Sequence, residues 1–348
     1  MRPRFATRTA AASVAIACAA AASARAQWVP QASGTAADFR GLSVVNARVV
    51  WVSGSGGTVV RTIDGGATWH ADTVPGAAAL DFRAVQAFDA RVAYVMSAGN
   101  GDKSQIYKTT DGGRHWTRQF TNGVAAGFFD AMAFWDRSHG IAMSDPVDGH
   151  FMLISTADGG AHWTRLDASS MPAALPNEGG FAASGTCLVS RGSMRAWIGT
   201  GGAAVSRVFS TADRGRTWRV DTVPVAAGNA SRGIFSIAFA DARLGYAVGG
   251  DYQQPRGDSA NAAVTRDGGR TWTPTATRLH GFRSGAAVMP GTSGRTVIAV
   301  GITGTDATSD GGARWTRVDD VEYNGVAFAA NGVGWAVGPK GRIARWRK

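Results

Sequence analysis

The sequence predicts an all-β protein, a seven-bladed β-propeller of four-stranded antiparallel blades, and three observations support this fold class. The string Thr-x-Asp-x-Gly-x-x-Trp occurs six times, and its successive aspartates lie 47, 47, 55, 54 and 43 residues apart, a period typical of propeller blades. Each period contains four short runs separated by turn residues, for example "FRAVQAF", "VAYVMSAG", "QIYKTT" and "HWTRQF", which indicates four strands. No segment has a sustained apolar stripe at helical spacing, so we expect little helix.

Residues 1–26 are predicted to be a signal peptide rather than part of the fold. Three arginines precede an Ala-rich apolar run, and "ARA" at residues 24–26 supplies a small-residue cleavage site before Gln27. We therefore expect cleavage after Ala26, a periplasmic or secreted location, and a single propeller domain over residues 27–348. Cleavage before Cys18, which would give a lipoprotein, is the weaker alternative because the apolar core before it is very short.

The six repeated strings, called boxes below, are predicted to be structural turns. Their aspartates are Asp64, Asp111, Asp158, Asp213, Asp267 and Asp310. A short Asp side chain accepts hydrogen bonds from the backbone of its own turn, and the Trp that follows packs against the neighbouring sheet. The residue after the aspartate varies, since Arg214 stands there in the fourth box, whereas the next residue is always Gly. We therefore expect the second glycine to be the one that needs a positive φ.

The six boxes belong to a ring of seven blades. After the last box, the tail from Tyr323 contains three more strand-like runs and no further box. The missing fourth strand is available at the other end of the mature chain, where residues 27–30 place Trp28 as the box strands place their tryptophans. The sequence therefore predicts that the N-terminal strand closes the seventh blade.

Candidate functional residues gather on the face opposite the boxes, at the mouth of the central channel. Alignment of the first strand of each blade places three arginines at one position, Arg40, Arg83 and Arg283, and aligns them with Phe129, Ile234 and Tyr323 of other blades. The ends of the second strands and the segment that enters blade four add Asp145, Asp148, Glu178, Asp251 and Tyr252. We predict that these residues bind a ligand or a partner, although turn and salt-bridge roles account for such residues equally well.

Composition excludes several classes of function. The precursor has a formal charge of +11, and the leader carries four arginines and no acids, so the mature chain keeps +7. No recognition-helix or RNA-binding signature accompanies this charge, and nucleic acid is not an expected partner. The histidines lack metal-ligand spacing and Cys187 is the single mature cysteine, so no metal, cofactor or internal disulfide is predicted. No mature segment has the roughly 20 apolar residues of a membrane helix, and we expect a monomer.

The box pattern resembles the Asp-box, or BNR, repeat, whose role in sialidases and sortilin-type receptors is structural. The mature chain as a whole resembles exported propellers of the photosystem II stability/assembly factor type, through the boxes, "SDPVDGHF", "NEGGFAASGT", "GGDYQQP" and "GPKGRIARW". This resemblance implies a chaperone-like role in which a basic surface, here Arg40, Arg83 and Arg283, binds a segment of a membrane protein. Some relatives carry the label oxidoreductase, which no dinucleotide or Cys-x-x-Cys motif supports here.

Two main functions follow from these residues. The favoured one is a non-catalytic binding module that holds a protein segment or a glycan of the cell envelope at the channel mouth, with or without a role in assembly. The alternative is a glycoside hydrolase of sialidase type, which needs an arginine cluster, a Tyr activated by Glu, and an Asp acid. Tyr323, Glu178 or Glu322, and Asp145 or Asp251 are the candidates for that chemistry. The Arg-Ile-Pro motif of sialidases is absent, because Arg342-Ile343 continues with Ala344.

Overall fold

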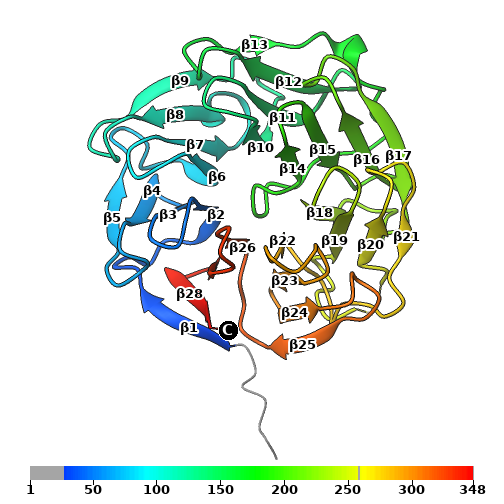
Figure 1. Cartoon of the computed structure of the whole chain (residues 1–348). Helices are drawn as coiled ribbons and strands as arrows, with labels where there is room; N and C mark the ends of the chain where they lie inside the picture. Colours follow the sequence, from blue (N-terminus) through cyan, green and yellow to red (C-terminus); the bar gives the residue numbers. More distant parts are fainter. Residues whose placement is uncertain (1–26, 258, 348) are drawn as a thin grey trace, which may run out of the picture.

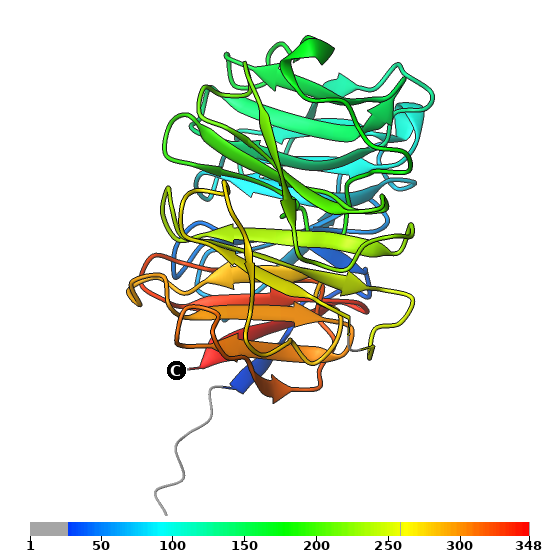
Figure 2. The same ribbon diagram turned by 90° about the vertical axis from the view of Figure 1, so that its right-hand side faces the viewer.

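The protein is a closed ring of seven four-stranded antiparallel sheets, as a computed structural model shows for residues 27–257 and 259–347 (Figure 1). Seen from the side, the blades form a disc with two faces (Figure 2). The sequence prediction of a seven-bladed, all-β fold is confirmed. Within the described residues, no helix is long and apolar enough to cross a membrane.

The blades follow one another along the chain. Blade one contains β2 (Phe39–Val44), β3 (Val50–Gly54), β4 (Thr58–Thr62) and β5 (His70–Thr73). Blade two contains β6 (Asp81–Ala87), β7 (Ala93–Ala98), β8 (Gln105–Thr109) and β9 (Thr117–Thr121). Blade three contains β10 (Phe129–Phe134), β11 (Gly140–Val147), β12 (His150–Thr156) and β13 (Thr164–Arg165). Blade four contains β14 (Leu188–Arg191), β15 (Arg195–Gly199), β16 (Ser206–Thr211) and β17 (Arg219–Val223).

The remaining blades complete the ring. Blade five contains β18 (Arg232–Phe239), β19 (Gly245–Asp251), β20 (Ala262–Thr265) and β21 (Thr273–Pro274). Blade six contains β22 (Gly285–Val288), β23 (Val297–Gly301), β24 (Gly304–Thr308) and β25 (Thr316–Asp319). Blade seven contains β26 (Gly325–Phe328), β27 (Gly334–Val337), β28 (Arg342–Arg347) and β1 (Gln27–Ala32). Two short 3₁₀ turns, η1 (Gly101–Lys103) and η2 (Ala168–Ser170), lie in connecting loops.

The N-terminal strand closes the ring, as predicted. β1 pairs antiparallel with β28 from Gln27 opposite Arg347 to Ala32 opposite Arg342. Trp28 is 8% exposed and donates its indole N–H to Thr305 Oγ1 of blade six at 3.0 Å. The two ends of the described chain are thus held together by one strand pair and by an aromatic side chain that reaches the preceding blade.

Apolar side chains of adjacent sheets form the core between the blades. The second strand contributes large buried rings at one position, including Trp51, Trp197 and Trp335. The indole N–H groups of Trp51 and Trp197 reach turns of the next blade along the ring, where they donate to Asp89 O and Gly268 O at 3.0 and 2.9 Å. Burial of such rings is the main favourable term in the folding free energy. The single described cysteine, Cys187, is buried and free.

Each box forms the turn between the third and fourth strands and repeats one hydrogen-bond set. In blade one, Thr62 Oγ1 donates to Asp64 Oδ1 at 2.7 Å, and Asp64 accepts from Thr68 N at 2.9 Å. The hydrogen bond from the Thr68 hydroxyl, followed by that from its backbone N–H, lowers the pKa of Asp64. These carboxylates are occupied by their own turns, which gives them a structural role.

The prediction that only the second box glycine needs a positive φ is wrong. Both glycines have φ between 69° and 93° in five boxes, and Arg214 takes the first position with a φ of 61°. The two positions face different neighbours: a Cβ on Gly65, at the first position, would lie 2.9 Å from Ala47 O of its own blade, whereas a Cβ on Gly312, at the second, would lie 2.7 Å from Val264 of blade five. Arg214 shows that a side chain can occupy the first position at a positive φ, and the second position faces the neighbouring blade.

Candidate binding site at the channel mouth

A pocket of about 540 Å³ lies at the channel mouth and is lined by residues of six blades and of the segment that leads into blade four. It is on the face where the first strands begin, opposite the boxes. The C-terminal end of β28 lies on the box face, at the left of Figure 2. A groove of about 730 Å³ continues from the pocket over blades three and four and shares Asp145, Gly180 and Phe181 with it. The mouth and the groove together offer a continuous path for an extended ligand.

In blades one, two, three and five, one residue of the first strand faces the mouth because the strand bulges there. In blade one the pairing shifts between Phe39 and Gly41, which leaves Arg40 outside the ladder. The same shift leaves Arg83 outside the ladder in blade two. A bulge re-aims the side chain that it releases, so the bulged residue points to the pocket while its neighbours stay in the blade.

The equivalent residue in other blades is of a different type. Blades three and five bulge at Asp130 and Phe235. In blades six and seven, Ser284 and Asn324 stand directly before the glycines that pair with the second strand. All of these residues line the pocket. The mouth-facing residue is therefore charged in blades one to three and apolar or neutral in blades five to seven.

Arg40 and Arg83 lie close enough to affect each other. Burial, followed by the charge of Arg83, lowers the pKa of Arg40. Arg83 is held by Asp81, with 2.7 Å between Nε and Oδ2, whereas Arg40 donates to Ala183 O at 3.3 Å without a close carboxylate partner among the described residues. The charges of Asp81, Asp38 and Glu322 act in the opposite direction on the pKa of Arg40, but none of these acids forms an ion pair with it. A planar guanidinium group that lacks a paired acid can bind the carboxylate of a ligand in a bidentate manner.

The prediction that Arg283 lines the mouth is wrong. Its side chain is fully buried and forms an ion pair with Asp306 at 2.6 Å, and it donates to Thr303 Oγ1 at 2.6 Å. The reason is the register of the strands. Gly285 pairs with Val300 as Gly41 pairs with Ser53, so Arg283 occupies the buried position of Phe39. A shift of one residue moves a side chain to the opposite side of a strand.

The same shift corrects the aligned residues of three other blades. Phe129, Ile234 and Tyr323 are buried, and each is the residue before the one that faces the mouth. The alignment of the first strands by sequence therefore assigned the mouth-facing position to a residue one place too early in these blades. Asp130, which the sequence analysis missed, is the mouth-facing residue of blade three; the signal was its place directly after a buried phenylalanine, as in "DFRAV" and "FFDAM".

Asp130 and Asp145 form a carboxylate pair at the mouth. Asp130 is 1% exposed, and burial together with the adjacent Asp145 carboxylate raises its pKa. Burial also raises the pKa of Asp145 to about 6. Asp145 Oδ1 accepts a hydrogen bond from Gly180 N at 2.7 Å. The predicted position of Asp145 at the mouth agrees with the structure, and the pair holds a proton more tightly than two isolated carboxyls.

Residues 178–185, called the plug below, enter the mouth from blade four and contact most of the ring. Ala183 and Ala182 accept hydrogen bonds from Arg40 and Arg83, at 3.3 and 3.5 Å. Ser184 Oγ donates to Ser284 O of blade six at 2.7 Å. The Phe181 ring stacks on Phe235 of blade five, with 3.7 Å between centroids. The plug fills the upper channel and forms part of the floor of the pocket.

Glu178, predicted to bind a ligand or to activate Tyr323, anchors the base of the plug instead. Its carboxylate is fully buried and forms an ion pair with Arg207. It also accepts hydrogen bonds from Thr200 Oγ1 at 2.6 Å and from Leu175 N at 2.8 Å. A carboxylate with this set of partners is a structural group, since removal of one partner leaves the other charge buried and unpaired.

Two further acids also have local roles. Asp251 is 3% exposed and accepts from Ser231 Oγ at 2.7 Å and from Arg232 Nε at 2.9 Å. Asp148 is exposed in the turn between β11 and β12, with a φ of 54°. Neither side chain lines the pocket. Tyr252, in contrast, lies at the mouth and is 43% exposed.

The groups required for sialidase chemistry are not brought together. Tyr323 is 2% exposed and packs against Trp28, with 5.5 Å between ring centroids. Burial raises the pKa of its hydroxyl, which opposes activation as a nucleophile. Glu178 is held by Arg207. Within the described chain, no group of three His, Cys, Asp or Glu residues is arranged to hold a metal ion.

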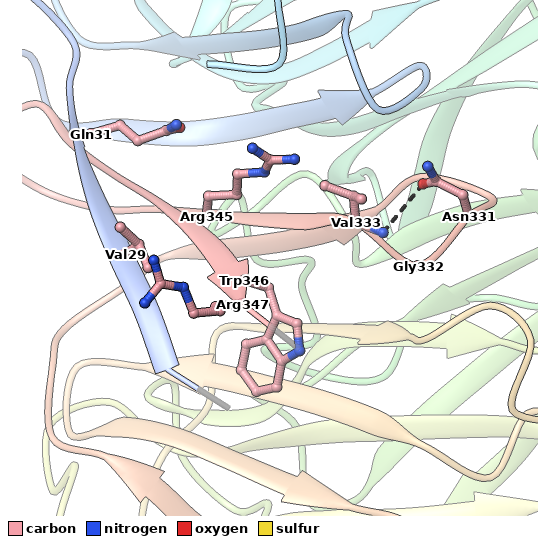
Figure 3. Close-up of a pocket in the computed structure, with 8 residues that line it drawn as sticks. All are labelled: Val29, Gln31, Asn331, Gly332, Val333, Arg345, Trp346 and Arg347. Atoms are coloured by element: carbon pink, nitrogen blue, oxygen red, sulfur yellow. Dashed lines mark hydrogen bonds between the residues drawn. The ribbon is translucent and has the colours of Figure 1, made fainter. Parts of the chain in front are cut away.

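A separate pocket of about 390 Å³ lies at the closure of the ring on the outer strands (Figure 3). Figure 3 shows Val29 of β1 beside Arg345 and Arg347 of β28, with the turn at residues 331–333 opposite. Gln31 donates to Gly66 O at 2.9 Å, and it accepts from Trp335 at 3.0 Å. This pocket lies where the chain ends replace a box, and we assign it to closure of the ring.

The fold and the mouth define a seven-bladed propeller with a plugged channel and a charged pocket on one face. No family model matches the chain, and comparison with curated proteins finds no match. Among solved structures, it is similar to "YCF48 bound to D1 peptide", with a TM-score of 0.66, 17% identity, and coverage of 92% of this chain and 97% of that chain.

Two further structures share the architecture. YCF48 from Cyanidioschyzon merolae gives a TM-score of 0.58 at 18% identity, covering 93% of this chain and 99% of its own. The WD40 propeller domain of Doa1 gives a TM-score of 0.60 at 12% identity, covering 92% of this chain and 98% of its own. These similarities demonstrate a common fold.

Proposed function

We propose that this protein is an exported, non-catalytic binding protein of the assembly-factor type, which holds an extended segment of a partner protein at the channel mouth. The observation that carries the proposal is the pair of guanidinium groups, Arg40 and Arg83, in a pocket that six blades and the plug line together. A carboxylate of the partner is the group that such a pair binds best.

Three further observations support a peptide rather than a small metabolite. The mouth continues into the groove over blades three and four, which gives an extended chain room on both sides of Asp145. The plug already places backbone carbonyl oxygens on Arg40 and Arg83, so the two arginines accommodate main-chain geometry. One structure with the same fold is bound to a D1 peptide. A periplasmic or secreted location, with the leader removed after Ala26, is part of this proposal.

The proposal is tested by capture of envelope proteins on the immobilised mature chain. The test variant is Arg40→Gln with Arg83→Gln. The matched control is Arg243→Gln with Arg270→Gln, which makes the same change in net charge at two exposed arginines near the box face. We expect the same proteins to bind the parent and the control, and their recovery to fall at least about tenfold with the test variant, equivalent to about 1.4 kcal/mol.

Equal losses in both double variants would mean that binding depends on net charge alone and would contradict the proposed site. A fluorogenic sialoside is added to the same samples as the test of the hydrolase alternative. Turnover by the parent that disappears in the Arg40 and Arg83 variant would establish an enzyme and overturn the proposal.

A further inference from the structure

We propose that the mouth selects partner segments in which a large apolar side chain lies within about two residues of a carboxylate. This inference rests on the proposed function and specifies its ligand. It comes from an apolar cluster that faces Arg40 and Arg83 across the same pocket. The cluster consists of Phe181, Phe235, Tyr252, Phe282 and Ile302, all of which line the pocket.

The cluster has a rigid base. Phe235 and Phe282 are each 4% exposed, and their rings meet edge to face with 4.6 Å between centroids. Phe181 stacks on the other side of Phe235 at 3.7 Å. Phe282 N donates to Pro255 O at 2.9 Å, which fixes the backbone beside blade six. A base of packed rings keeps its shape when a ligand arrives, so little ordering entropy is lost on binding.

Two apolar side chains at the top of the cluster are open to solvent. Tyr252 is 43% exposed and Ile302 is 41% exposed. The Tyr252 ring stands edge to face on Phe235, with 6.0 Å between centroids. Exposed apolar side chains that rim a concave pocket mark binding sites more strongly than scattered ones. The apolar side of the mouth therefore has a surface that a ligand side chain can cover.

The register of blade six explains why this side is apolar. The shift that buries Arg283 also brings Phe282 to the wall of the pocket. Blade five thus presents the Phe235 ring where blades one and two present guanidinium groups, and blade six adds the Phe282 ring two residues before its equivalent residue, Ser284. A segment that crosses the mouth meets both surfaces. The guanidinium groups on one side favour a segment with a carboxylate, and the same segment then places its neighbouring side chains on the apolar cluster.

The plug indicates the spacing that such an occupant needs. Its Phe181 ring lies on Phe235, and the carbonyl oxygens of the next two residues accept hydrogen bonds from Arg83 and Arg40. An aromatic side chain is therefore one or two residues from the oxygen atoms that the arginines bind. A partner segment that reaches the same two surfaces from above requires a similar distance between its apolar side chain and its carboxylate.

The test is a selection from a library of random 12-residue peptides displayed on phage, with the immobilised mature chain as the target. We expect enrichment of Asp or Glu within about two residues of Phe, Trp, Leu or Tyr. The test variant is Tyr252→Ser with Ile302→Ser. We expect it to keep the acidic enrichment and lose the apolar one, with the best parental peptide binding about tenfold more weakly in calorimetry.

Val321→Ser is the matched control, because Val321 is 41% exposed and does not line the pocket; it should change neither enrichment nor affinity. Thermal melts of all variants check that the fold is intact. Selection of acidic peptides without apolar neighbours, or identical selection by the Tyr252 and Ile302 variant, would overturn this inference and leave the proposed function standing. If the peptides selected by the parent are selected equally well by the Arg40→Gln, Arg83→Gln variant, or if no peptide is enriched, the proposed function is overturned as well.

Discussion

The box turns and the channel mouth occupy opposite faces of the same ring and differ in how they use repetition. Every box has a Thr hydroxyl that donates to its Asp and accepts from the second Gly, as in Thr62 and Gly66 or Thr308 and Gly312. At the mouth, the equivalent residue in or directly before the first strand is Arg in blades one and two, Asp in blade three, Phe in blade five, Ser in blade six and Asn in blade seven. One face repeats its chemistry, and the other varies it.

This difference separates architecture from candidate function. A turn whose polar groups bond to one another in each blade stabilises the blade and has little capacity left for a ligand. At the mouth, the backbone position repeats but its side chain varies from blade to blade. Such variation changes the chemistry of the surface without destabilising the fold, and binding sites in repeat proteins are built in this way. Changes at the boxes should therefore affect stability, and changes at the mouth should affect binding.

The largest expected effect on stability comes from the buried carboxylate of Glu178, which anchors the plug on the mouth face. Glu178→Gln leaves the buried Arg207 guanidinium without a counter-charge, and it should lower the free energy of unfolding by about 3–5 kcal/mol. Urea unfolding followed by tryptophan fluorescence measures this. Glu322→Gln is the matched control, since Glu322 lines the rim of the pocket, and it should change stability by less than about 0.5 kcal/mol. Equal effects would show that the base of the plug is not a fixed structural element.

The next effect concerns a box. Gly215 has a φ of 84°, and a Cβ there would lie 3.0 Å from Ile141 Cδ1. Gly215→Val should cost about 1–3 kcal/mol from backbone strain alone, with peptide binding unchanged. In the control, Gly123→Val, the Cβ meets open space and φ is not positive, so the melting temperature should stay close to that of the parent. A stable Gly215 variant would contradict the steric account of the box.

The carboxylate pair at the mouth, Asp130 and Asp145, predicts that the free energy of unfolding depends on pH. Because the folded-state pKa of Asp145 is about 6 and its ordinary value is 3.8, the folded chain holds a proton that the unfolded chain releases between these values. The resulting stability is present near pH 4 and is lost as pH rises to about 6, with a slope of at most about 1.4 kcal/mol per pH unit.

Asp145→Asn should remove this loss, so that the melting temperature of the variant rises relative to that of the parent between pH 4 and 7 in calorimetric melts. The exposed Asp148→Asn is the control and should follow the parent across the same range. Parallel curves for the parent and the Asp145 variant would mean that the pair does not share a proton in solution.

The smallest expected effect is at the one box that departs from the consensus. Arg214→Gly relieves a φ of 61° but removes the hydrogen bond from Nε to Ser193 O, which is 2.7 Å long. Because these changes oppose each other, the net loss should not exceed about 1 kcal/mol. A larger loss in a thermal melt would show that the first box position needs its side chain, and that the boxes are less uniform than their backbone.

The sequence was sufficient for the fold because the features that specify a blade are local and repeated. The box string, the four runs per period and the position of Trp28 together predicted seven blades and closure by the N-terminal strand, and the strand pairing of Gln27 with Arg347 confirms it. Alternation of side chains within a strand, turn chemistry and repeat length all act over a few residues, so they can be recognised without contacts between distant segments.

The candidate site was predicted only in part because it depends on register and on distant partners. Arg40, Arg83, Asp145 and Tyr252 were placed correctly at the mouth. Arg283 was not, since a one-residue difference in strand pairing places it in the blade. The partner of Glu178 is Arg207, which is 29 residues further along the chain, and no local pattern indicates that they pair.

By itself, therefore, the sequence determined the number of blades, the closure of the ring and the structural role of the boxes, because short-range chemistry repeated six times leaves little freedom. Only the tertiary structure decided which side chains meet at the mouth. That choice depends on bulges that turn single residues out of the sheet, and on a plug that crosses the channel to contact Arg40, Arg83 and Phe235. Such contacts join residues from different blades, and their geometry exists only after the ring has closed.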